Sequence, residues 1–259
     1  MGTILVFKLL TMPVVMTTAT LAGRRFGPAV AGLILGLPIV SGPISVFVAI
    51  EQGVPFAQRA ATGTLLGLIA LAAYALAYGH AAQRLGWIGS LVCGLATTVV
   101  SVTLLNVVEI PEPAVIWVTC AAVAAVIWLC PGPGEPVARP PAPGWDLPAR
   151  IAVATAFMLT VTVAAEAIGP AMTGMASTFP VMLSVMAPFT HRVEGRAAVV
   201  AMMRGCAEGL VTFALFFQVL RLLLGVLPPV AAYLIALAAS LALALVVLLL
   251  QRRRAVAVR

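Results

Sequence analysis

Residues 27–68 decide the fold of this chain, and they read GPAVAGLILGLPIVSGPISVFVAIEQGVPFAQRAATGTLLGL. Residues 169–210 repeat the pattern without a gap, 142 positions further on, as GPAMTGMASTFPVMLSVMAPFTHRVEGRAAVVAMMRGCAEGL. What recurs is backbone shape, because the matched residues are mostly Gly and Pro: Gly27 with Gly169, Pro28 with Pro170, Gly32 with Gly174, Pro38 with Pro180, Phe47 with Phe189, Gly53 with Gly195, Gly63 with Gly205 and Gly67 with Gly209. In a hydrophobic chain, such paired and interrupted segments indicate a transporter-type site between two related halves. The alternative is an accidental match, because Gly and Pro are frequent in membrane helices.

The composition is that of an integral membrane protein. Of the 259 residues, 63% are hydrophobic and 9% are charged, whereas soluble domains carry about 25% charged residues. The net charge of +7 does not indicate nucleic-acid binding, because the basic residues fall between hydrophobic runs, where they orient helices in the bilayer. The four cysteines form no C-x-x-C pair, and no P-loop, H-E-x-x-H or G-x-S-x-G motif is present. We therefore expect no metal, no cofactor and no enzymatic activity.

Hydrophobic runs and charge together predict the topology. A bilayer core about 30 Å thick needs roughly 20 apolar residues per helix. Nine runs meet this requirement, at residues 3–22, 28–50, 57–79, 86–108, 113–130, 148–168, 170–190, 196–223 and 228–250. With the N-terminus outside, eleven arginines fall on the cytoplasmic side and only Arg59 and Arg221 on the other. This asymmetry predicts a multi-pass protein of the cell inner (plasma) membrane with a cytoplasmic C-terminus.

A connection rich in Pro and Gly divides the chain into two repeats. Residues 131–147 are expected to form a semi-rigid cytoplasmic linker. It follows a first repeat of five transmembrane helices, residues 1–130, and precedes a second repeat of four helices and a basic tail, residues 148–259. Five spans separate the equivalent first helices, so the two copies must cross the membrane in opposite directions. The predicted fold class is all-α, a polytopic membrane protein with two inverted-topology repeats.

Prolines interrupt the second and seventh predicted helices. Pro38 and Pro180 each remove a backbone donor and clash with the preceding turn, about 15 Å from the helix start and so near the midplane. Backbone groups freed at that depth must be satisfied by neighbours, water or a ligand. Ser41, Ser177 and Thr178 are placed to cap a second half-helix, whose N-terminus would suit an anionic group. These five residues form the core of the predicted substrate site, and a proline kink healed by packing is the alternative.

Arg204 and Glu208 are the strongest ionisable candidates within a span. They are four residues apart and so share one face of a helix, and charged groups inside a bilayer usually face a bundle interior or a wet cavity. Gly205 and Gly209 beside them have a spacing that allows close helix approach, which would bring the pair near the interrupted helices. We include both residues in the predicted substrate site. A self-neutralising structural pair is the alternative.

Other ionisable residues lie at helix ends. Glu51 and His191 are predicted gate or proton-relay groups. Lys8 aligns with Arg150 at the repeat offset. For this pair we expect long side chains that reach the membrane surface by snorkelling.

One segment resembles a known family. The string Ala31-Gly-Leu-Ile-Leu-Gly-Leu-Pro38, followed by Glu51-Gln-Gly53 and a hydrophobic helix, is similar to the core of the small GlpM-type bacterial inner-membrane proteins. The second half is similar through Thr173-Gly174 and Phe179-Pro180, although its turn reads Val193-Glu194-Gly195. Each half then resembles one such protein over about fifty residues. The resemblance implies membrane localisation and, through the family's link to alginate production, envelope polysaccharide or solute traffic. It supplies no catalytic residues.

These observations predict a secondary transporter or flippase-like permease for a small polar or anionic solute. Without a domain to bind ATP, transport would depend on proton or sodium coupling. The alternative function is a non-transporting accessory membrane subunit for envelope polysaccharide production or export. In that case the Gly-rich faces would dock the helices of an envelope-assembly partner, or of a second copy in a homodimer. The lipid bilayer is a partner in either case.

Overall fold

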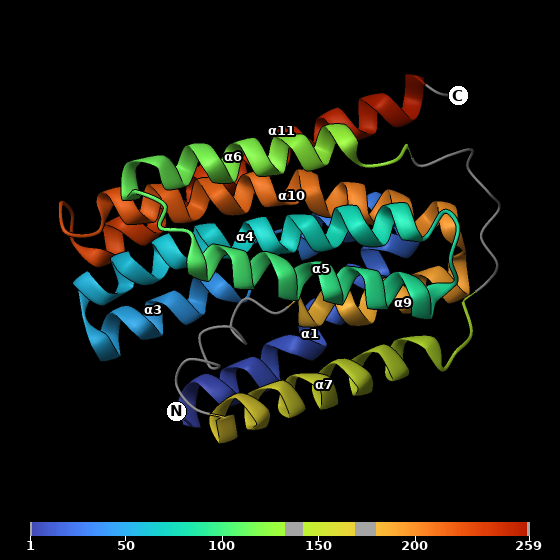
Figure 1. Ribbon diagram of the computed structural model, residues 1–259, viewed down its shortest axis with the longest axis horizontal. Coiled ribbons are helices and arrows are strands. Elements are labelled where there is room, and N and C mark those ends of the chain that lie inside the picture. The colour runs from blue at the N-terminus through green and yellow to red at the C-terminus, as the bar shows by residue number, and fades with distance from the viewer. Residues whose placement is uncertain (1, 133–141, 169–179, 258–259) are drawn as a thin grey trace.

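The computed structural model describes residues 2–132, 142–168 and 180–257, in which the long helices lie side by side along one axis (Figure 1). Regular structure in these residues is helical apart from one isolated bridge between Leu224 and Leu227. The helices are α1 (Gly2–Phe26), α2 (Pro28–Leu35), α3 (Ser41–Gln52), α4 (Val54–Ala81), α5 (Trp87–Val107), α6 (Glu112–Leu129), α7 (Asp146–Ile168), α9 (Val181–Glu194), α10 (Arg196–Leu223) and α11 (Pro229–Ala257).

The second predicted span is broken where Pro38 lies. Helix α2 ends at Leu35 and α3 begins at Ser41, because proline lacks the amide that would continue the helix. The amide of Gly36 closes α2 by donating to the carbonyls of Gly32 and Leu33 at 3.0 and 3.1 Å. The predicted break at Pro38 is confirmed. In the second half Pro180 directly precedes α9, whereas residues 169–179 lie outside the described part of the chain.

Helix bounds recur at the same offset as the sequence. Helices α4 and α10 are both 28 residues long, and α10 begins and ends 142 positions after α4. Each follows a glycine with positive φ, 85° at Gly53 and 90° at Gly195, a conformation that residues with a Cβ rarely adopt. The bounds of α4 and α10 thus recur at the offset of the sequence match.

Helices α4 and α10 lie antiparallel. Gln58 near the start of α4 donates to the carbonyl of Leu224, just past the end of α10. At the other end of the pair, Arg196 at the start of α10 donates to the carbonyl of Gln83, just past the end of α4, at 3.3 Å. Helices α1 and α7 run antiparallel in the same way (Figure 1).

Helix α10 lies at the centre, and its glycines contact the backbone of α2. A Cβ on Gly205 would come within 2.0 Å of the Ala29 carbonyl oxygen, and one on Gly32 within 1.9 Å of the Met202 carbonyl oxygen. Gly36 and Gly209 approach each other in the same seam. The expected close approach at Gly205 and Gly209 is confirmed, and the glycine face is directed at the broken segment.

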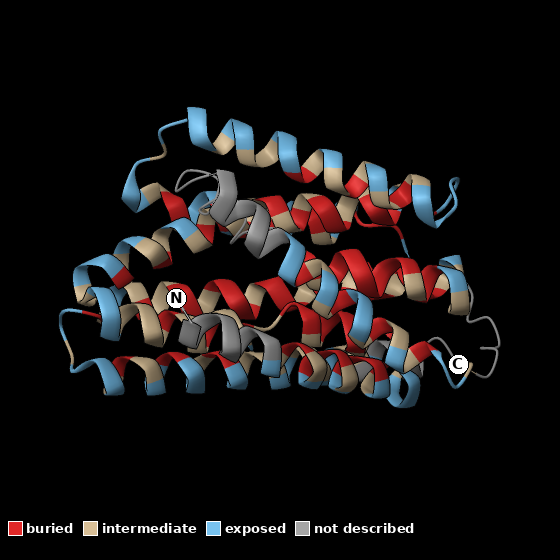
Figure 2. Cartoon of the chain, turned by 90° about the horizontal axis from the view of Figure 1, so that it is seen from below, coloured by how far each residue is buried: buried red, intermediate tan, exposed pale blue. Residues whose placement is uncertain are grey.

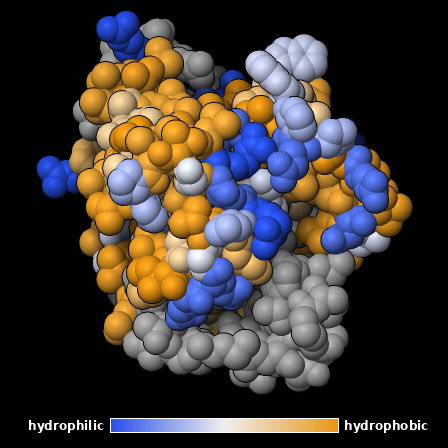
Figure 3. Space-filling model, turned by 90° about the vertical axis from the view of Figure 1, so that its left-hand side faces the viewer, coloured by the Kyte–Doolittle hydropathy of each residue, from blue (hydrophilic) through white to orange (hydrophobic). Residues whose placement is uncertain are grey.

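The outer surface is apolar over most of its length. Five of the described helices are long and apolar enough to cross a membrane: α4, α5, α6, α10 and residues 229–251 of α11. Of the most apolar stretch, 61% is buried in α10 but only 11% in α11, so α10 lies in the core and α11 at the periphery. Buried residues gather inside the bundle and exposed residues lie on its outer helices (Figure 2). Hydrophilic side chains gather instead at one end of the molecule, the left-hand end in Figure 1, and hydrophobic side chains surround them (Figure 3). The chain is thus an all-helical membrane protein.

Candidate functional site

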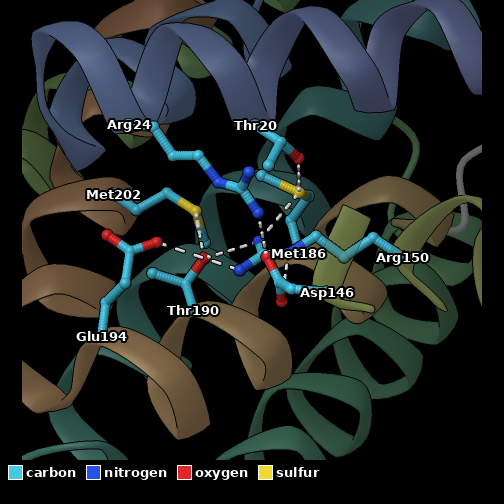
Figure 4. A network of polar contacts seen from close by, with 8 residues as sticks. All are labelled: Thr20, Arg24, Asp146, Arg150, Met186, Thr190, Glu194 and Met202. Carbon is cyan, nitrogen blue, oxygen red and sulfur yellow. Dashed lines mark hydrogen bonds and ion pairs between the residues drawn. The ribbon is translucent and has the colours of Figure 1, made fainter. Parts of the chain in front are cut away.

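A buried ion-pair network joins the ends of α1 and α7 (Figure 4). The side chains of Asp146 and Arg150 are each only 1% exposed. Arg150 Nε donates to both Oδ1 and Oδ2 of Asp146 at 3.0 Å. Arg24 donates from Nη2 to Oδ2 of the same carboxylate at 2.9 Å. One carboxylate thus binds two guanidinium groups, one from each half of the chain.

The remaining nitrogens of Arg150 contact α9. Nη1 donates to Thr190 Oγ1 at 3.1 Å and to Met186 Sδ at 3.4 Å. Nη2 lies 3.9 Å from Glu194 Oε1. The guanidinium carbon is 5.5 Å from the centre of the Phe189 ring, within cation–π range. These partners compensate the charge, which a buried guanidinium requires.

Helix geometry explains why these groups meet. Asp146 lies in the first turn of α7 and Arg24 in the last turn of α1, where the helix dipoles favour a negative and a positive charge respectively. Because α1 and α7 are antiparallel, these two turns are adjacent. Asp146 and Arg150 are four residues apart on one face of α7. With Glu194, the network contains two cations and two carboxylates, so its formal charge is zero.

A small cavity lies beside the network. Its lining residues belong to α1, α2, α7, α9 and α10, and they include Thr20, Pro28, Thr190 and Met202. The lining borders about 200 Å³ of empty space, but the enclosed part has room for only about one water molecule. The two halves of the chain are therefore in closed contact at this end, next to the N-terminus of α2.

The residues predicted at the breaks have different positions. Pro38 is buried between α2 and α3, and its carbonyl accepts from the Gly42 amide at 2.9 Å. Ser41 is half-buried as the first residue of α3, where Val40 is the N-cap and no side-chain cap is formed, so the expected capping role of Ser41 is wrong. Pro180 is the N-cap of α9. Ser177 and Thr178 lie outside the described residues.

Arg204 and Glu208 form a second ion pair. Arg204 Nε lies 3.8 Å from Glu208 Oε1, with side-chain exposures of 32% and 12%. Gln251 on α11 donates to Glu208 Oε2 at 2.7 Å, and Arg204 donates to the carbonyl of Cys130 at 3.4 Å. These contacts are directed at α11 and the end of α6, whereas the adjacent Gly205 faces α2.

The predicted gate residues lie in unlike surroundings. Glu51 is exposed near the end of α3. His191 is 8% exposed, and its Nδ1 lies 3.5 Å from the Tyr78 hydroxyl, with the rings edge-on. It follows Thr190 in the chain and so adjoins the Arg150 network.

Sequence reasoning missed the network itself. Arg150 was expected to snorkel to the membrane surface, but it is buried against Asp146 and Thr190. The available signal was the spacing of Asp146 and Arg150, the same spacing that drew attention to Arg204 and Glu208. It was overlooked because the helix was expected to begin at Pro148, which left Asp146 in the linker, whereas α7 begins at Asp146.

The fold and the buried charges define an all-helical, multi-pass membrane protein. No protein-family model, no curated protein and no solved structure matches this chain. Among the described residues, no group of three His, Cys, Asp or Glu side chains is placed to hold a metal ion.

Proposed function

We propose that this protein is a secondary transporter or flippase-like permease for a small polar or anionic solute, built from two inverted repeats. The observation that carries the proposal is the antiparallel packing of the equivalent helices α4 and α10, whose bounds recur at one offset. Inverted repeats with discontinuous helices are typical of secondary transporters, in which the substrate binds at the repeat interface near the bilayer midplane.

The proposed topology has nine passes. The broken pair α2 and α3 counts as one pass, and α9 completes the equivalent pass in the second half. The protein lies in the cell inner membrane with its N-terminus outside and its C-terminus in the cytoplasm. Arg24, Arg150 and the arginines after Gln251 then lie on the cytoplasmic side.

In this proposal, the Arg150 network is a closed cytoplasmic gate. Arg24 belongs to the first repeat and Arg150 to the second, and both bind the carboxylate of Asp146. Separation of the repeats at this end would break these ion pairs and connect the cavity beside Thr190 to the cytoplasm. His191 and Tyr78 continue the polar contacts from the gate toward α4. The substrate would bind at the breaks, around Pro38, Ser41 and Pro180 together with Ser177 and Thr178, with Arg204 and Glu208 as polar contributors.

The proposal is tested by flux through purified protein in liposomes under an imposed proton or sodium gradient. Small anions, sugars and amino acids are offered separately. The expected result is gradient-dependent flux of one solute class that is lost in Glu208→Gln and altered in Asp146→Asn. Glu109→Gln, at an exposed residue between α5 and α6, is the control and should retain the flux.

A lack of flux for every solute class and for polar lipids would contradict the transport proposal. Stable co-purification with an envelope synthase or exporter would then favour the accessory role. Normal flux in Glu208→Gln, in contrast, would remove only this residue from the substrate site.

A further inference from the structure

An apolar groove follows α2 between α1 and α11. Its lining consists entirely of Ala, Val, Leu, Ile and Phe side chains, among them Val30, Ile34, Leu37, Ala244 and Leu248. The groove borders about 790 Å³ of empty space, compared with about 200 Å³ for the cavity beside Arg150. A lining without polar groups suits a hydrocarbon chain and offers nothing to a polar solute.

The length of the groove fits one leaflet of a bilayer. It begins at Phe26, at the end of α1, and reaches Leu37 in the break after α2. Val30 and Ile34 lie four residues apart on α2, about 6 Å along the helix, and Leu37 continues the lining into the break. One leaflet of a bilayer core is about 15 Å deep. A chain that enters at the end of α1 would therefore lie along α2 within one leaflet and end beside the break.

Basic groups lie where the groove opens. Arg25 is exposed, and its guanidinium carbon lies 5.4 Å from the centre of the Phe26 ring, which lines the groove. On the other wall, α11 continues past Leu248 to the exposed Arg253. A hydrocarbon groove with cations at one end is complementary to a lipid with an anionic headgroup.

We propose that this groove binds an anionic phospholipid of the surrounding membrane. One acyl chain lies along α2 between α1 and α11, and the phosphate group contacts Arg25. Zwitterionic lipids share the acyl chain but carry no net negative charge, so they bind more weakly. The proposal is independent of the proposed transport function, because it requires only that the chain reside in a membrane.

Native mass spectrometry of the full-length protein tests the site. The protein is released from detergent with added phosphatidylglycerol or phosphatidylcholine, and the bound lipid is read as added mass. Ala244→Trp fills the groove and is expected to remove the phosphatidylglycerol adduct. Ala242→Trp is the matched control, because Ala242 is exposed on the same helix but does not line the groove, and it should retain the adduct.

Arginine variants test the headgroup contact without altering the groove. Arg25→Gln is expected to lower the preference for phosphatidylglycerol over phosphatidylcholine about fivefold, the contribution of one cation near a membrane surface. Arg59→Gln is the control, because Arg59 has the same stacked geometry over Phe56, 5.9 Å from its centre, away from the groove. It should leave the preference unchanged.

Three results would overturn the proposal. The first is equal retention of both lipids by the unmodified protein. The second is equal behaviour of the two tryptophan variants, whether both keep or both lose the adduct, since lipid would then bind the helix surface in general. The third is a dimer of the protein, detected without bound lipid and absent in Ala244→Trp. This result would assign the groove to a second copy of the protein.

Discussion

Asp146→Asn isolates the energetic role of the buried network. The substitution keeps the shape of the side chain but removes the negative charge that binds both Arg150 and Arg24. Arg24 is 34% exposed and can turn toward solvent, whereas Arg150 is 1% exposed and cannot. Arg150 then keeps only Glu194 as a carboxylate partner, at 3.9 Å.

The magnitude follows from this burial. Removal of one partner from a buried ion pair costs about 3–5 kcal/mol, and the remaining Glu194 places the expected loss of unfolding free energy near the lower bound, about 3 kcal/mol. For a chain of this size that corresponds to a fall in Tm of roughly 10 °C. The measurement is thermal unfolding of the purified protein in detergent, followed by the fluorescence of its tryptophans.

Glu208→Gln is the matched control for this prediction. It also breaks an ion pair between residues four apart, but Arg204 is 32% exposed and the atoms are 3.8 Å apart. Glu208 is 12% exposed, but Arg204 can turn toward solvent and Gln251 can still donate to the oxygen of the glutamine amide, so we expect a loss of about 1 kcal/mol and a fall in Tm of about 3 °C. The reasoning is refuted if Asp146→Asn unfolds within a degree of the unmodified protein, or if the control loses as much.

The remaining predictions concern the backbone features of the repeat. Gly205→Ala should prevent normal folding, because its Cβ would meet the Ala29 carbonyl oxygen at 2.0 Å. Gly86→Ala is the control: its Cβ would have nothing within 4 Å, and the variant should elute like the unmodified protein in size-exclusion chromatography. Identical elution profiles for the two variants would contradict the packing of α10 against α2. Gly53→Ala should lower the unfolding free energy by about 1 kcal/mol or more, because its φ of 85° and ψ of 166° lie in a region essentially confined to glycine; a stability unchanged in thermal unfolding would count against it. Pro38→Ala should restore helical hydrogen bonding across the break and reduce flux in liposomes without lowering Tm, and a variant with full flux would show that the break is not needed for transport.

The break at Pro38 was predictable because Pro and Gly act locally. Pro38 removes a helix donor and lies between Gly36 and Gly42, which favours a break; proline alone does not require one, because Pro13 and Pro188 lie inside α1 and α9. Gly53 and Gly195 end α3 and α9 at equivalent positions, and each carries a positive φ. Each of these constraints comes from the residue at that position, so the sequence alone was sufficient to predict the break.

The Arg150 network was not predictable in the same way. Its ion pair with Arg24 joins residues 122 positions apart and depends on the packing of α1 against α7. The local part, the Asp146–Arg150 spacing, could have been found, but the helix start two residues too late concealed it. The contacts of Arg204 with Cys130 and of Glu208 with Gln251 likewise depend on tertiary packing.

The sequence match also relates charged residues near the opposite ends of α1 and α7. The offset of 142 positions relates Arg150 to Lys8 and Arg24 to Glu166, a cation on α1 and an acid on α7, at positions that face the other side of the bilayer in the proposed topology. If each half can adopt the conformation of the other, we expect closure there to accompany opening at Arg150. Paired cysteines at positions 8 and 166 should then cross-link mainly when those at 24 and 150 do not, and simultaneous cross-linking of both pairs would argue against such an exchange. The two halves would then form two alternative closing contacts, one at each end of α1 and α7. Only one of these contacts would be present at a time.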